Sequence, residues 1–141
     1  MPLLIRDGTA ADLAAITTIF LAAFASEPLI ARTHPHAAQY PSHPHLYYRR
    51  FFEARFWGPE QQILRVAVDA ATDEPGQGAG SWLVRDALSR VVDPEGAACW
   101  LIGLEGVEPF YDRFGFREVD RANEGRLADW TGGAVMIRES S

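Results

Sequence analysis

The chain has 141 residues, of which 48% are hydrophobic and 23% are charged, and this balance is typical of one soluble globular domain. The net charge of −6 argues against a nucleic-acid partner, because phosphate backbones bind Lys and Arg. No stretch is long and apolar enough to cross a membrane, and the single cysteine, Cys99, excludes an internal disulfide. We therefore predict a single domain over residues 1–141 and a cytoplasmic location.

The N-terminal part predicts a strand over residues 3–6, followed by a helix. Thr9 to Asp12 has the spacing of a capping box, although Asp12 stands where Glu or Gln is preferred. Apolar residues at helical spacing continue to Phe24, and Pro28 interrupts the pattern.

Residues 28–59 are rich in aromatic residues and prolines. Four histidines lie between positions 34 and 45, and imidazole is a common metal ligand. No acidic or cysteine ligand adjoins them, so we do not predict a metal site. A helix is expected over residues 46–56, ended by Gly58 and Pro59, with most of its aromatic rings in the core.

A β-branched run over residues 63–68 predicts a strand, and a glycine-rich loop over residues 76–81 leads into an amphipathic helix. Glycine lets the backbone approach a ligand closely, and the first turn of a helix presents unpaired N–H groups. This order favours a phosphate or pyrophosphate site. A P-loop would need Lys after the last glycine, so the loop does not match that motif. A dinucleotide fingerprint would need a third glycine at position 81 or 83, so the loop does not match that motif either. A plain glycine-rich turn is the alternative.

The C-terminal part predicts strands over residues 98–104, 116–119 and 134–138. The first is nearly all apolar, which predicts a central strand, and Cys99 within it is expected to be a buried, unreactive thiol. A short helix over residues 109–114 should end at Gly115.

Two stretches resemble the GNAT superfamily of N-acetyltransferases. Gly78 and Gly80 match the small positions of its acetyl-CoA motif, Gln/Arg-x-x-Gly-x-Gly/Ala, but Pro75 departs from the Gln/Arg position. The C-terminal signature, Tyr-x-x-x-Gly-Phe, is matched at Tyr111, Gly115 and Phe116.

The resemblance implies an α/β (α+β) fold with a mixed, mostly antiparallel central sheet flanked by helices. The superfamily places three antiparallel strands before the glycine loop, and these need roughly 19 residues with their turns. Residues 61–74 leave room for one strand, so we expect a reduced N-terminal half that lacks two strands. The edge left unpaired favours pairing between two chains as a homodimer.

The resemblance also implies direct transfer of an acetyl group from acetyl-CoA, as co-substrate, to an amine of a small molecule. The base that removes the amine proton would be Glu105, with Asp69 and Glu27 as alternatives, and the acid for the leaving thiolate would be Tyr111. An oxyanion donor would be a strand N–H near Val68. The implied cofactor-binding residues are Val66, Val68, Gly76, Gln77, Gly78, Ala79, Gly80 and Ser81.

Two alternatives stay open at this point. The missing strands and Pro75 also fit a degenerate, non-catalytic homologue that acts as a binding or interaction module. The second alternative is an enzyme that catalyses a different reaction in the same pocket, since a fold does not fix a function.

Overall fold

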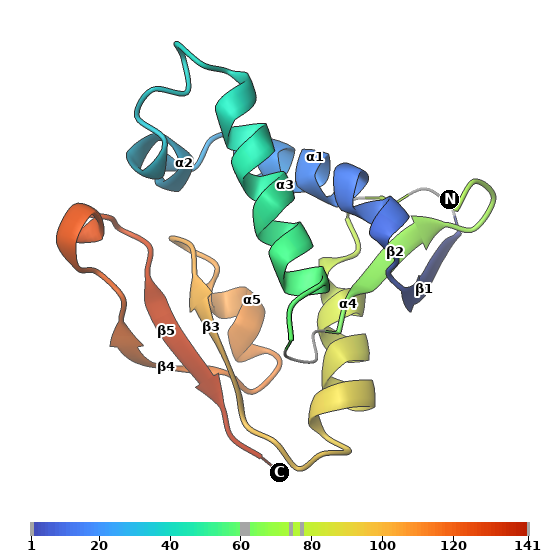
Figure 1. Cartoon of the computed structure of the whole chain (residues 1–141). Coiled ribbons are helices and arrows are strands. Elements are labelled where there is room, and N and C mark those ends of the chain that lie inside the picture. Colours follow the sequence, from blue (N-terminus) through green and yellow to red (C-terminus); the bar gives the residue numbers. More distant parts are fainter. Residues whose placement is uncertain (1, 60–62, 74, 77, 141) are drawn as a thin grey trace. The chain divides into compact units, whose positions relative to one another are not determined.

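The computed structural model describes residues 2–59, 63–73, 75–76 and 78–140. The chain divides into two compact units, residues 1–83 and 84–141 (Figure 1). The first unit contains β1 (Leu3–Asp7), the 3-10 turn η1 (Ala10–Asp12), α1 (Leu13–Ala23), α2 (Pro28–Thr33), α3 (Ser42–Phe56), β2 (Arg65–Asp69) and the beginning of α4 (Gly80–Ala87). The second contains the rest of α4, the π-helical turn η2 (Leu88–Val92), β3 (Cys99–Gly103), α5 (Glu108–Asp112), β4 (Arg117–Arg121), the 3-10 turn η3 (Gly125–Leu127) and β5 (Ala134–Arg138).

In the first unit, β1 and β2 form an antiparallel two-stranded sheet, with Leu3 opposite Asp69 and Asp7 opposite Arg65. Among the described residues between α3 and α4, β2 is the one strand, as the sequence predicts. Helix α1 packs against α3 through Phe20, whose ring centroid lies 4.6 Å from that of Tyr48. Tyr48 is buried, as expected for the core, but other rings of this region, Tyr40, Tyr47 and Trp57, are exposed.

The capping box forms as predicted. Thr9 N–H donates to Asp12 Oδ2 at 2.7 Å, which stabilises the start of the first helical turn. Arg6 of β1 adds two hydrogen bonds to the same carboxylate, at 2.9 and 3.0 Å. Asp12 therefore joins the first strand to the first helix.

Acidification is expected to remove the stabilisation that Asp12 provides. Chiefly the hydrogen bonds from Arg6 lower the pKa of the Asp12 carboxyl from 3.8 to about 2, and Asp12 is 5% exposed. Because the folded-state pKa lies below the unfolded one, about 2 kcal/mol of stability is present above about pH 4 and is lost as the pH falls toward about 2. Urea unfolding of wild type and Asp12→Asn tests this. Their unfolding free energies should differ at neutral pH and converge in acid, and a constant difference would contradict the assignment.

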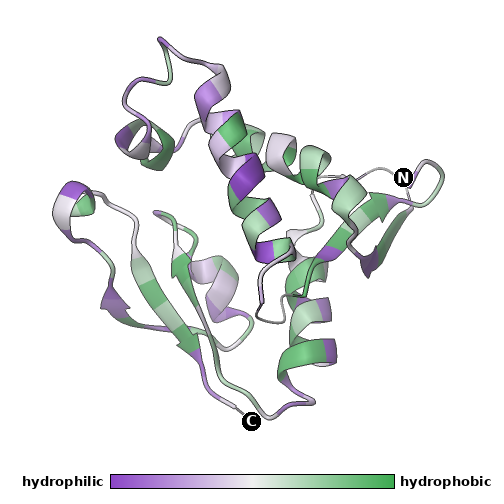
Figure 2. Cartoon of the chain, viewed as in Figure 1, coloured by the Kyte–Doolittle hydropathy of each residue, from purple (hydrophilic) through white to green (hydrophobic). Residues whose placement is uncertain are grey.

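In the second unit, β3, β5 and β4 form an antiparallel sheet in that order, with a bulge in β4 between Glu118 and Asp120. Most of β5 is hydrophobic (Figure 2), and Ala134 and Met136 of this strand are fully buried in a core with Leu88 and Phe116. All strand pairs in both units are antiparallel, and helices accompany both sheets, which confirms the predicted α/β class.

Two sequence-based expectations were wrong. β3 is an edge strand rather than a central one, because the last strand, β5, lies between β3 and β4, and Trp100 of β3 is 69% exposed. Strand order depends on pairings distant in sequence, which an apolar run does not encode. Helix α3 begins at Ser42, four residues before the predicted start, with Pro44 in its first turn, where no N–H donor is needed.

Candidate active site

The glycine loop follows β2 and turns back along its edge. Val68 forms an isolated antiparallel bridge with Pro75, and Gly76 N–H donates to Ala67 O at 3.0 Å. Because Val68 also pairs with β1, Pro75 and Gly76 lie along the opposite edge of β2. Gln77, a predicted cofactor contact, lies outside the described residues.

The loop then enters α4 through a left-handed turn. Gly78 has φ +80°, and a Cβ atom built on it would meet no atom within 4 Å, so its backbone is open to a ligand. Leu83 N–H donates to Ala79 O at 2.9 Å, so the helical bonding begins here and the N–H groups of the first turn point out of the helix end. A surface pocket of about 520 Å³ is lined by Pro2, Leu3, Gly78, Ala79, Ser81 and Trp82, none of which is charged.

The alternation of hydrogen bonds in β2 decides which backbone groups face this edge. Leu64 O accepts from Gly8 N–H at 2.8 Å, and Ala70 N–H donates to Pro2 O at 3.0 Å, so even-numbered residues bond toward β1. The backbone groups of Val66 and Val68 therefore lie in the β1–β2 ladder, and both side chains are buried. The odd-numbered residues Ala67 and Asp69 face the other edge, along which Pro75 and Gly76 lie.

An arginine holds the segment that leads into the loop. Arg6 Nε donates to Asp73 Oδ1 at 2.7 Å while the same guanidinium binds Asp12, and these bonds raise the pKa of Arg6. Asp73 has φ +57°, a left-handed conformation that Asp tolerates better than most residues. The ion pair thus fixes the turn that precedes the loop to the capping box of the first helix.

Tyr111 lies in α5 of the second unit and is half-buried against the core around Phe116. Burial raises the pKa of its hydroxyl, so the phenol stays protonated at neutral pH, as a general acid requires. Gly115, with φ +86°, ends the helix as predicted. Its N–H donates to Asp112 O at 3.0 Å, and Phe116 N–H donates to Tyr111 O at 3.4 Å, the pattern of a Schellman motif.

Glu105 lies in the turn after β3 and is exposed. Its Oε2 accepts a hydrogen bond from Thr131 Oγ1 at 2.6 Å, and Gly133 N–H donates to Gly103 O at 2.8 Å beside this turn. The Glu105 carboxylate is therefore oriented by a neighbouring segment of the same unit, as a general base needs, and keeps one oxygen for a proton.

The two alternative bases lie in the first unit and differ in their surroundings. Asp69 Oδ1 accepts the N–H of Ala71 at 2.7 Å, which closes the turn after β2. Glu27 precedes α2, and its Oε2 is buried without a hydrogen-bond partner in the part of the chain that the structure describes. A buried carboxylate oxygen without a donor would gain from an amine N–H, so Glu27 keeps its place among the candidates.

Comparison with known proteins found one solved structure with a similar fold. No family model and no curated protein matches the chain. A solved structure described as histone acetyltransferase HPA2 and related acetyltransferase from Corynebacterium glutamicum superposes with a TM-score of 0.69 over 100% of this chain and 98% of that chain, at 18% identity. The chain has a GNAT fold.

The fold is the one that the resemblance of the glycine loop and the Tyr-x-x-x-Gly-Phe signature implies. Identity of 18% establishes the fold alone, so the roles of Glu105, Tyr111 and the loop residues stay predictions. The described residues of the predicted loop lie in the first unit, and Glu105 and Tyr111 lie in the second. The pairing of Arg6 with Asp73 was missed, because its partners are 67 positions apart and no motif joins them.

The described residues form neither a group that could hold a metal ion nor a helix that could cross a membrane. Across the described ranges, no three His, Cys, Asp or Glu side chains gather in a way that could hold a metal ion. None of the helices in the described part has the length and hydropathy needed to cross a membrane. Cys99, predicted to be buried, is a half-buried free thiol, and burial raises its pKa.

Proposed function

We propose that the chain is an N-acetyltransferase that transfers an acetyl group directly from acetyl-CoA to an amine of a small molecule. The observation that carries the proposal is the left-handed glycine loop at the start of α4 in a chain with a GNAT fold. The loop fits a pyrophosphate, because the open backbone at Gly78 adjoins the exposed N–H groups of a helix start. Since none of the described residues that line the pocket is charged, these backbone dipoles would have to supply most of the binding.

The chemistry needs two proton transfers and a hydrogen-bond donor. Acetyl-CoA supplies the thioester whose C–S bond breaks as the new amide C–N bond forms. Glu105 would take the proton from the attacking amine, and the Tyr111 hydroxyl would hold the proton that the departing sulfur needs. A backbone N–H on the edge of β2 that faces away from β1, from Ala67 or Asp69, would donate to the carbonyl oxygen as negative charge develops there.

Calorimetric titration with acetyl-CoA is the direct test of the proposal. We expect binding in the micromolar range, followed by release of free CoA when a suitable amine is added. A folded protein that does not bind acetyl-CoA would overturn the proposal. That result would favour the alternative function, a non-catalytic binding module. Pro75 at the motif's Gln/Arg position also favours this alternative.

Replacement of the base is expected to reveal which carboxylate acts. Glu105→Gln keeps the shape and the bond to Thr131 but cannot accept the amine proton, so kcat/KM should fall by about a hundredfold at neutral pH. Glu27→Gln is the matched control and should change the rate less than about threefold. The reverse pattern would assign the base to Glu27.

We also propose that two chains associate through an open strand edge. β3 and β4 are the outer strands of the second sheet in the described chain, and exposed edges favour pairing with another strand. Sedimentation at micromolar concentration should give the mass of a homodimer, and a monomeric mass would exclude it.

A further inference from the structure

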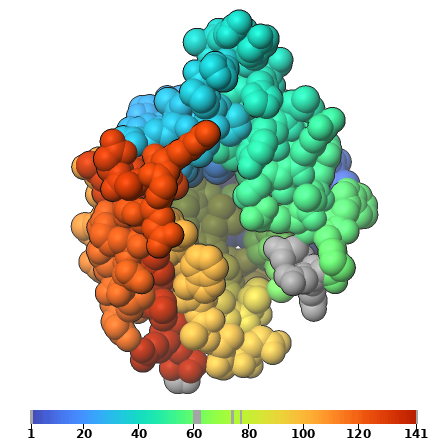
Figure 3. Space-filling view, turned by 60° about the vertical axis from the view of Figure 1, so that its left-hand side comes forward, coloured from blue at the N-terminus to red at the C-terminus, as the bar shows by residue number. Residues whose placement is uncertain are grey.

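One segment of an otherwise acidic chain carries a net positive charge. Residues 28–58 hold four of the 13 basic residues, all arginine, but one of the 19 acidic residues, Glu53. All four histidines also lie in this segment. It comprises α2, α3 and their connection, which lie on the surface of the first unit in Figure 3, coloured cyan to green. A local cationic surface on a chain of net charge −6 attracts anionic ligands.

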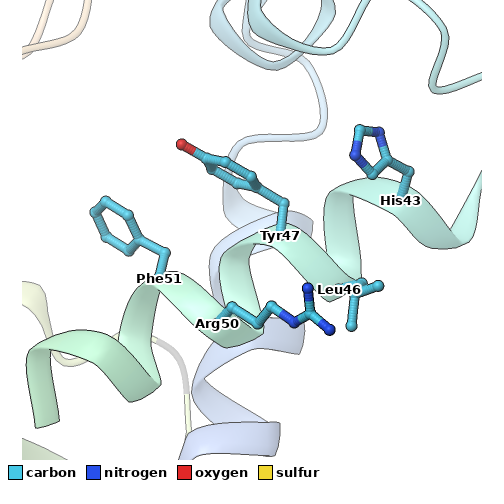
Figure 4. A pocket seen from close by; sticks show the side chains of 5 residues that line it. All are labelled: His43, Leu46, Tyr47, Arg50 and Phe51. Carbon is cyan, nitrogen blue, oxygen red and sulfur yellow. The ribbon is translucent and has the colours of Figure 1, made fainter. Parts of the chain in front are cut away.

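A groove of about 370 Å³ runs along α3 within this segment. Its volume falls within the range of about 300–1,000 Å³ that small-molecule sites commonly have. Figure 4 shows the lining side chains in two rows on α3. The aromatic row consists of His43, Tyr47 and Phe51, and the second row consists of Leu46 and Arg50. The lining residues are His43, Leu46, Tyr47, Arg50 and Phe51.

The aromatic row is held in place by buried neighbours. The ring of Tyr47 lies 4.8 Å from that of His34 and 5.1 Å from that of Tyr48, and both of these rings are buried. Phe51 contacts the same Tyr48 ring at 6.0 Å. The half-exposed ring of Tyr47 therefore presents a fixed apolar wall, which lowers the entropy lost when a ligand binds.

Arg50 differs from the other arginines of α3 in having no partner within the described chain. Arg49 donates to Glu53 at 2.6 Å, and the Arg55 guanidinium lies 3.5 Å from the centre of the Phe51 ring. Arg50 is exposed at the groove and makes no hydrogen bond or ion pair in the described part of the structure. A guanidinium that is not neutralised offers two parallel N–H donors to a carboxylate or phosphate.

We propose that this groove recognises an anionic group of the acceptor, so that the acceptor is an amine that also carries a carboxylate or a phosphate. Arg50 binds the anion, with His43 as a second donor, and the apolar part of the acceptor lies against Tyr47 and Leu46. This inference rests on the proposed acetyl transfer and names the substrate class for it.

Matched pairs of amines test the recognition of an anion. Phenylalanine and phenethylamine differ by a carboxylate, and phosphoethanolamine and ethanolamine differ by a phosphate. We expect the wild type to prefer the anionic member of at least one pair, and the pair that responds identifies the anion. Arg50→Gln should raise KM for that member by roughly tenfold or more while changing KM for the neutral amine by less than about twofold. Equal KM values within both pairs, or equal effects of Arg50→Gln on both members, would overturn the inference.

A binding measurement separates this inference from the proposed enzyme activity. Phenylacetate and phenyl phosphate carry the anion but no amine, so they should bind wild type and lose affinity in Arg50→Gln whether or not acetyl-CoA binds. Arg126→Gln, which changes an exposed arginine of η3, is the matched control and should bind both probes as wild type does. Probe binding that is unchanged in Arg50→Gln, or equally weakened in Arg126→Gln, would refute the site. Binding of acidic peptides without binding of either probe would assign the surface to a protein partner and refute it as well.

Discussion

Gly78→Asp is expected to weaken acetyl-CoA binding by roughly a hundredfold, whereas Gly78→Asn should weaken it by less than about tenfold. Gly78 has φ +80°, and Asp and Asn are the side chains that best tolerate this left-handed region. No atom lies within 4 Å of the added Cβ, so neither side chain clashes with the fold. The two variants therefore differ mainly by one negative charge beside the expected pyrophosphate, which costs about 1.5–3 kcal/mol at such a site.

Gly96 provides the matched control for this pair. It also has a positive φ, +58°, and open space around its Cβ, but it lies in the turn after η2 rather than at the start of α4. Gly96→Asp should therefore leave the acetyl-CoA dissociation constant within about twofold of wild type, as measured by calorimetry. Equal losses in Gly78→Asp and Gly78→Asn would show that the backbone conformation matters and the charge does not, against a pyrophosphate at this loop.

Features of the fold that depend on interactions between neighbouring residues could be predicted from the sequence. The capping box at Thr9 and Asp12, the helix stop at Gly115 and the last strand, residues 134–138, all follow from spacing within a few residues. The predicted start of α3 lies four residues too late, because a proline, Pro44, stands in its first turn, where proline fits a helix. Strand order could not be predicted, because it depends on pairings distant in sequence.

In the candidate site, too, local features could be predicted and pairings between distant residues could not. Glycine spacing predicted a loop whose backbone can approach a ligand closely, and Gly78 has the positive φ that glycine allows. The pattern could not tell which backbone groups of β2 face the loop, because alternation of apolar side chains describes the two faces of a sheet and not its two edges. Val66 and Val68 were predicted as cofactor contacts, and their backbone groups bond toward β1, whereas Ala67 and Asp69 face the edge along which Pro75 and Gly76 lie. The sequence also could not show that, within the described chain, Glu53 bonds to Arg49 and Phe51 contacts Arg55, while Arg50 has no partner.

Tyr111→Phe is expected to lower kcat for acetyl transfer by about a hundredfold while the protein stays folded. The substitution removes one hydroxyl and keeps the ring, whose centroid lies 5.0 Å from that of Phe110 and 5.8 Å from that of Phe116. Loss of a general acid typically costs a hundredfold or more. The acetyl-CoA dissociation constant should stay unchanged, because the variant affects departure of the thiolate rather than binding.

The pH dependence separates an acid at Tyr111 from a packing role. Burial raises the pKa of this phenol, so the wild-type rate should hold at neutral pH and fall only in strongly alkaline solution, once the hydroxyl loses its proton. Tyr111→Phe should lack that alkaline fall, because it has no proton to lose. If Tyr111→Phe instead keeps the wild-type kcat and pH profile and lowers the melting temperature, the residue packs α5 against the core and another group protonates the thiolate. The alkaline limb therefore decides the role of Tyr111 independently of the size of the rate loss.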